Sequence, residues 1–204
     1  MSEPTVRRER KDAARNLERV LDAARALFAE RGGDVTMEEV AQRAGVGVGT
    51  IYRRFQNKEH LFATLSQAAC RDTRFCLYQA ADDAPDTLGK LRAIIVVQYR
   101  QVALQSGLIK MQPMPVHECE SCAQHDLYAS VSLMLRELIA QGQRQGHIRP
   151  GDPDVLAALC LELLSPHTFE RLQLVVGPRD DLAEQVASFV IAGLVPEGNG
   201  ALCR

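Results

Sequence analysis

The stretch that decides the fold is Thr36-Met-Glu-Glu-Val-Ala-Gln-Arg-Ala-Gly-Val-Gly-Val-Gly-Thr-Ile-Tyr-Arg-Arg-Phe55. Thr36 carries a hydroxyl that can cap the first amides of a helix, and Glu39 stands three residues later, where the acid of a capping box belongs. Gly45 follows at the point where a left-handed turn residue is needed. We therefore predict a helix that begins near Met37 and ends in a tight turn at Gly45.

A second short helix is predicted from about Gly47 to Phe55. Ile51 and Phe55 recur at a four-residue step and should face inward. The outward side chains are small at the start of this helix and basic at its end, namely Val48, Gly49, Thr50, Arg53 and Arg54. This distribution suits a helix in a DNA major groove, because small side chains approach base edges and cations hold phosphates. The alternative is an ordinary helical hairpin within a core.

The residues around this hairpin carry a more specific signal. They include the run Asn16-Leu-Glu-Arg-Val-Leu-Asp-Ala-Ala-Arg-Ala-Leu-Phe-Ala-Glu-Arg-Gly32, then Ala44-Gly-Val, Thr50-Ile-Tyr-Arg-Arg-Phe55 and Lys58-Glu-His-Leu-Phe62. Over residues 16–62 the chain closely resembles the TetR family of bacterial repressors, and beyond Phe62 only helical character and length agree with it. The resemblance implies an all-α protein, in which an N-terminal helix-turn-helix domain of three helices is joined to a larger helical ligand-binding and dimerisation domain.

The resemblance also implies individual contacts with DNA. Phosphate contacts are expected at Thr36, Tyr52, Arg53 and Lys58, groove or base-edge contacts at Val48 and Thr50, and a close approach of the backbone at Gly49. Gly47 departs from the family pattern, because many relatives carry a serine or threonine there, so the second helix should lack a side-chain cap. Val48 replaces a residue that is often polar, and valine can touch a thymine methyl but cannot read guanine through hydrogen bonds. No operator sequence follows from these residues.

We divide the chain into an N-terminal arm with the helix-turn-helix DNA-binding domain at residues 1–56 and a helical effector-binding and dimerisation domain at residues 57–204. The arm is basic, with Arg7, Arg8, Arg10, Lys11 and Arg15 placed ahead of the first helix. It could follow a phosphate backbone or enter a minor groove. The alternative is a solvated basic tail.

Past Phe55 the apolar residues recur at helical spacing, with no alternating strand pattern. A helix is expected from about Lys58 to Ala81, and prolines bound the later ones, with Pro166 interrupting the helix that follows Pro153. The faces predicted to be buried in the last helices are Leu156, Leu159, Leu163 and Leu164 in one and Leu182, Val186, Phe189 and Val190 in the other.

Composition limits the class of protein. The chain has 204 residues, 46% of them hydrophobic, and a formal net charge of -2. That length can bury a substantial core. No apolar run approaches the length of a membrane span, and no secretory apolar segment follows the basic start, so a cytoplasmic protein is expected.

The resemblance implies a homodimer that binds a palindromic operator in double-stranded DNA, most simply a repressor that a small-molecule effector releases. The residues alone do not distinguish repression from activation, and they do not identify the effector. Candidate liners of an effector pocket are large or adaptable side chains placed between predicted helices: Phe75, Tyr78, Tyr99, Met111, Met114, Met134 and Phe169. The alternative for each is a plain core position.

One cluster is not explained by the resemblance. His117-Glu-Cys-Glu-Ser-Cys-Ala-Gln-His125 places two thiols in Cys-x-x-Cys spacing between two histidines. His117, Cys119, Cys122 and His125 are ligands that zinc accepts, although no cofactor is required by the family. A thiol switch at Cys122 and unliganded side chains in a connecting segment are the alternatives. A zinc or thiol enzyme is disfavoured, because catalytic Cys-x-x-Cys motifs usually follow a strand and none is predicted.

Overall fold

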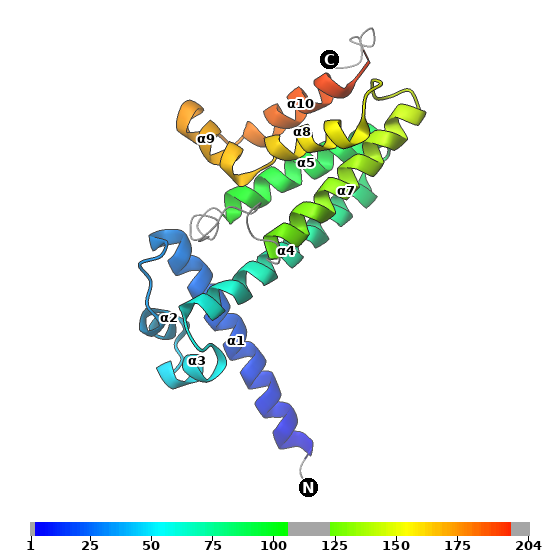
Figure 1. The fold of residues 1–204 in the computed structure, drawn as a ribbon. Helices are drawn as coiled ribbons and strands as arrows, with labels where there is room; N and C mark the ends of the chain where they lie inside the picture. The colour runs from blue at the N-terminus through cyan, green and yellow to red at the C-terminus, as the bar shows by residue number, and fades with distance from the viewer. Residues whose placement is uncertain (1–2, 106–122, 197–204) are drawn as a thin grey trace. The chain divides into compact units, whose positions relative to one another are not determined.

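The computed structural model describes residues 3–105 and 123–196, with side chains from Ala14 onward, and this part of the chain is all-α, as predicted (Figure 1). The described residues form nine helices and no strand. Their bounds are α1 Glu3–Arg31, α2 Met37–Ala44, α3 Val48–Arg54, α4 Lys58–Asp83, α5 Thr87–Leu104, α7 Ala123–Arg144, α8 Pro153–Leu163, α9 Pro166–Val176 and α10 Leu182–Leu194.

The described residues form two compact units that divide within α4, between Ala69 and Cys70. In the first unit, α1, α2, α3 and the start of α4 enclose one core, to which they contribute Val20, Ala24, Phe28, Val40, Ile51, Phe55, Leu61 and Leu65. The rings of Phe28 and Phe62 meet edge to face, with their centroids 6.4 Å apart. The two short helices α2 and α3 are therefore fixed by a core that they share with two longer helices.

Helix α1 starts earlier than the sequence suggested. The basic arm was expected to precede the first helix, but α1 runs from Glu3 to Arg31 and includes it. Two features of the sequence account for this. Pro4 is acceptable in the first turn of a helix, and the residues from Thr5 to Arg15 include no glycine or further proline to stop it.

The second unit is built around α5, which packs against α7, α9 and α10, while α7 packs against α8. Leu91, Ile94 and Ile95 of α5 are fully buried. The rings of Tyr99 in α5 and Phe169 in α9 meet edge to face at a centroid distance of 5.6 Å. The central position of α5 explains why its apolar residues are not confined to one face.

Pro166 interrupts the helix after Pro153, as predicted. Helix α8 ends at Leu163 and α9 begins at Pro166, with Ser165 as its N-cap. The Ser165 hydroxyl accepts a hydrogen bond from the Thr168 amide at 3.2 Å. A proline at the first position of a helix loses no hydrogen bond, so the break costs little.

Two residues predicted to be core are not. Leu159 in α8 is 58% exposed and Phe189 in α10 is 71% exposed. Helical spacing of apolar residues was the basis for both predictions, but this spacing also occurs in a helix with a second apolar face. Leu156 and Val190 do lie in the core.

Among the described residues, no helix combines the length and the apolar character that crossing a membrane requires.

We predict that Gly142→Ala destabilises the second unit. Gly142 is buried in α7, and a Cβ atom there would lie 2.5 Å from Cδ1 and 2.7 Å from Cγ1 of Ile148. Overpacking of this kind costs about 1–3 kcal/mol, to be measured by urea denaturation. Ile148→Val removes the nearest atom, so the double variant should lose less than the sum of the two single losses. Strict additivity would show that the contact is not responsible.

Candidate nucleic-acid interface

The start of α2 carries the predicted capping box. The Thr36 hydroxyl accepts a hydrogen bond from the Glu39 amide at 3.2 Å, and the Glu39 carboxylate accepts one from the Thr36 amide at 2.9 Å. Arg31 donates a further hydrogen bond to Glu39 at 2.7 Å. The Thr36 amide and then the Arg31 guanidinium hold the pKa of the Glu39 carboxyl below its usual range. The charged carboxylate thus ties the end of α1 to the start of α2.

The turn between α2 and α3 also follows the prediction. Gly45 has φ +63°, in the left-handed region where a Cβ atom is disfavoured. The Val46 amide donates to the Ala41 carbonyl at 3.0 Å and closes the end of α2. A Cβ atom on Gly45 would lie 2.5 Å from the guanidinium of Arg19, which itself donates to the Gly45 carbonyl at 3.4 Å. The backbone angle therefore requires glycine here, whereas the flexible end of the Arg19 side chain could move aside.

Helix α3 presents the face that the sequence predicted. Ile51 and Phe55 are 1% and 2% exposed, whereas Val48 and Tyr52 are 38% and 46% exposed. Gly49, Arg53 and Arg54 are exposed, and Thr50 is half-buried. Gly47 is the N-cap and makes no side-chain hydrogen bond, as its departure from the family pattern indicated.

Two of the candidate phosphate donors already have partners within the chain. The Tyr52 hydroxyl donates to the Glu38 carboxylate at 3.2 Å, and the Lys58 ammonium donates to the Gly33 carbonyl at 2.7 Å. Desolvation, followed by the hydrogen bond to Glu38, raises the pKa of Tyr52. The phenol proton is thus directed to the Glu38 carboxylate in this structure.

The arginines of this unit fall into two groups. Arg43 makes two hydrogen bonds of 2.6 Å to Glu30, and Arg31 binds Glu39. Arg53 and Arg54, in contrast, have no hydrogen-bond or ion-pair partner within the described ranges. The two cations of α3 are thus available for an external anion.

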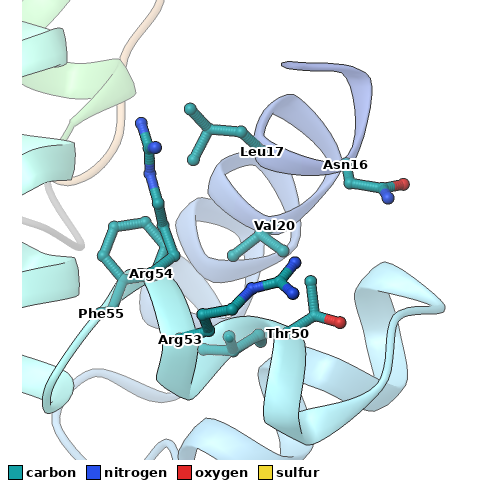
Figure 2. Close-up of a pocket in the computed structure, with 8 residues that line it drawn as sticks. Asn16, Leu17, Val20, Thr50, Arg53, Arg54 and Phe55 are labelled. Carbon is teal, nitrogen blue, oxygen red and sulfur yellow. The ribbon is translucent and has the colours of Figure 1, made fainter. Parts of the chain in front are cut away.

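Between α1 and α3 lies a cleft of about 240 Å³ (Figure 2). Its walls include Asn16 and Leu17 of α1 and Thr50, Arg53 and Arg54 of α3. Sequence reasoning missed both the cleft and the hydrogen bond from Tyr52 to Glu38. The partners are separated by fourteen residues or more along the chain, so no local pattern indicates that they meet.

The candidate effector residues do not all lie inside the molecule. Tyr99 and Phe169 are buried and in contact, and Met134 in α7 is half-buried. Phe75 and Tyr78 of α4 are 65% and 50% exposed, so they do not line an interior cavity of a single chain. Met111 and Met114 lie outside the described residues.

Most of the His/Cys cluster also falls outside the described residues, namely His117, Cys119 and Cys122. His125 lies in the first turn of α7. In the described ranges, no group of three or more histidine, cysteine or acidic side chains is placed to hold a metal ion. Zinc binding at this cluster remains a hypothesis based on the sequence.

The fold and the site define a class of protein, and comparisons with known proteins agree with it. The model of the family described as "Bacterial regulatory proteins, tetR family" matches residues 20–65. The transcriptional regulator TtgR of Pseudomonas putida is 26% identical over 158 residues, which cover 70% of this chain and 75% of the relative. The chain is thus a DNA-binding transcriptional regulator of the helix-turn-helix class.

Solved structures extend the similarity to the second unit. The fatty acid degradation regulator FadR from Bacillus halodurans has a TM-score of 0.70 at 21% identity, covering 88% of this chain and 96% of that one. SmeT, the repressor of a Stenotrophomonas maltophilia multidrug efflux pump, has a TM-score of 0.62 at 25% identity, covering 89% and 91%. These similarities support a TetR family transcriptional regulator, and that family is not enzymatic, which disfavours the zinc or thiol enzyme.

We predict that Gly49→Ala separates stability from DNA binding. Gly49 lies within α3 and a Cβ atom there would meet nothing within 4 Å. Alanine should therefore stabilise the fold by about 0.5–1 kcal/mol. The added methyl would nevertheless hold the backbone of α3 away from DNA and weaken duplex binding. Thermal unfolding and fluorescence anisotropy measure the two effects, and tighter DNA binding would contradict the proposed approach of α3.

Proposed function

We propose that this chain is a ligand-responsive repressor that binds a palindromic operator as a homodimer and is released from DNA by a small-molecule effector. In this proposal residues 1–56 bind DNA, residues 57–204 bind the effector and form the dimer, and the protein acts in the cytoplasm. The observation that carries the proposal is the outward face of α3, with its small side chains and its unpaired arginines.

We propose DNA contacts along α3 and at the starts of α2 and α4. Val48, Gly49 and Thr50 form the part of α3 that can approach base edges, while Tyr52 and Arg53 reach phosphates. Thr36 at the start of α2 and Lys58 at the start of α4 add two more candidate phosphate contacts. A recognition helix with so few polar side chains favours partial readout through DNA shape.

A homodimer is supported by apolar surface on the last helices. Val155 and Leu159 of α8 are 55% and 58% exposed, and Ala158 is exposed between them. Phe189 of α10 is exposed as well, next to the small residues Ala192 and Gly193 of the same face. The Arg149 amide, just before α8, donates to the Leu194 carbonyl at the end of α10 at 2.8 Å, so these ends lie together.

A second copy of the chain suits this surface because the apolar side chains are repeated at helical spacing and small residues allow helices to approach closely. Two-fold symmetry would also place two α3 helices about 34 Å apart, on successive major grooves of one DNA face. The palindromic operator follows from that symmetry.

Effector binding is supported by buried polar atoms in the second unit. The hydroxyl of Tyr99, Oε1 of Gln98 and Oε1 of Glu170 are buried and have no hydrogen-bond partner within the described residues. Most buried polar groups in proteins are satisfied, so such atoms suit a ligand that supplies the partner. Burial raises the pKa of Tyr99 to about 12, which keeps its proton available for donation. Tyr99 and Phe169 thus remain candidate effector residues.

Release of DNA requires that the effector bind one state of the protein better than the other. The favoured state would hold the two α3 helices of the dimer at a spacing that does not match successive grooves. The alternative is a metal- or thiol-responsive regulator that senses through His117, Cys119, Cys122 and His125. Zinc or an oxidant would then release DNA where small organic molecules do not.

We predict that Lys58→Ala and Thr50→Ala change DNA binding in different ways. Lys58→Ala should weaken binding to all duplexes and lower the salt dependence by about one charge, because a phosphate contact is independent of sequence. Thr50→Ala should change the preference among duplexes. Anisotropy titrations at several salt concentrations measure both, with Lys90→Ala in α5 as the charge-matched control. If Lys58→Ala and Lys90→Ala behave alike, the proposed phosphate contact is wrong.

We predict that Leu159→Glu or Phe189→Glu disrupts the dimer. A carboxylate at either position would have to be buried without a partner in the interface, which is strongly unfavourable. Light scattering after size exclusion should show a mass that falls from twice 22.5 kDa toward 22.5 kDa. Leu133→Glu, on an exposed apolar residue of α7, is the matched control and should leave the mass unchanged. A wild-type mass of one chain would refute the dimer.

A further inference from the structure

The cleft between α1 and α3 lies wholly within the first unit, beside Thr50 (Figure 2). Figure 2 shows Arg53 reaching toward Val20 and Thr50, and Arg54 reaching beside Leu17. Asn16 lies on the same side of the cleft as Thr50. The two guanidinium groups thus stand on different sides of one opening.

The charge of the cleft favours an anion. No acidic side chain belongs to its lining, and neither Arg53 nor Arg54 has a partner within the described residues. Asn16 is half-buried, and its side chain has no hydrogen-bond partner in the same residues. Its amide nitrogen is therefore a free donor in the lining that also holds the two free cations.

The rest of the lining is apolar. Val20, Ile51 and Phe55 are at most 3% exposed, and Leu17 is half-buried. An inorganic anion would leave this apolar wall unused. An occupant with both an anionic group and an apolar face uses the whole lining.

Two kinds of occupant have both an anionic group and an apolar face: a small organic anion and a sugar–phosphate unit of DNA. The volume of the cleft distinguishes between them. Pockets for small organic ligands usually measure roughly 300–1,000 Å³, and this cleft has about 240 Å³. A sugar–phosphate unit of DNA is small, carries one negative charge, and presents the apolar face of its deoxyribose. It also needs little affinity of its own, because other contacts hold the same duplex.

We propose that the cleft between α1 and α3 seats one sugar–phosphate unit of the DNA backbone, with Asn16 as a phosphate donor and Leu17 against the sugar. This inference rests on the proposed DNA contacts of α3 and extends the interface onto α1. Asn16 then fixes the depth at which α3 enters the groove, because phosphate contacts set register and orientation.

The test compares Asn16→Asp and Asn16→Ala with Gln67→Asp and Gln67→Ala in the full-length protein. Gln67 is an exposed amide on α4 outside the cleft, so its variants make the same change of charge elsewhere. The probe is a mixed-sequence duplex followed by anisotropy at low salt, since backbone contacts need no operator. Thermal unfolding of each variant checks that the fold is kept.

Asn16→Asp should weaken binding at least about ten-fold more than Gln67→Asp, because it sets a carboxylate against the phosphate. Asn16→Ala should cost about three-fold, with no change in the salt dependence, because a neutral donor is lost. If wild type binds the duplex and the Asn16 and Gln67 variants bind equally, the cleft proposal alone fails. If wild type binds no duplex at any salt concentration, the proposed function fails with it.

Discussion

Helix α3 has seven residues, too few to be stable as an isolated helix in water, so its position depends on the burial of Ile51 and Phe55. These two side chains enter the core formed by α1, α2 and the start of α4. Once they are buried, the pitch of the helix leaves Val48, Gly49 and Arg53 exposed. The candidate DNA-binding face is thus a consequence of core packing, and so is the cleft that α3 forms with α1.

The net charge of the chain is only -2, but paired and unpaired charges are distributed unevenly around this core. Glu39 and Glu30 are bound by Arg31 and Arg43, at side chains that are 34–51% exposed. Ion pairs at such exposure contribute little stability, because water screens the attraction. Their effect is positional, since they connect α1 to α2 and occupy the acidic groups of this surface. The cations of α3 are left to bind an external anion, which a mildly acidic protein can therefore do.

The parts of this structure that sequence reasoning predicted are local. Thr36 and Glu39 meet across three residues, Gly45 is required by its own backbone angle, and Pro166 stops a helix by its own chemistry. The fold class followed from such signals together with the family resemblance. The candidate DNA-contact residues came from the same short segment, and their role as contacts remains a proposal.

The wrong predictions concern side chains whose burial depends on what packs against their helix face. Leu159 and Phe189 have the spacing of core residues, but an apolar helix face is equally suited to a second chain. Phe75 and Tyr78 were chosen by size, which does not reveal the side of α4 on which they lie. Asn16 and Arg54 lie far apart in the sequence and share a cleft only because α1 packs on α3.

The most direct measurement is a selection from fragments of the genome that encodes the chain. Fragments retained by the purified, reduced protein would be sequenced and compared. The account predicts that they share an inverted repeat whose half-sites are centred about ten base pairs apart, or a multiple of that, as two α3 helices on one DNA face require. Retained fragments that share no sequence, or only a single unrepeated site, would contradict it.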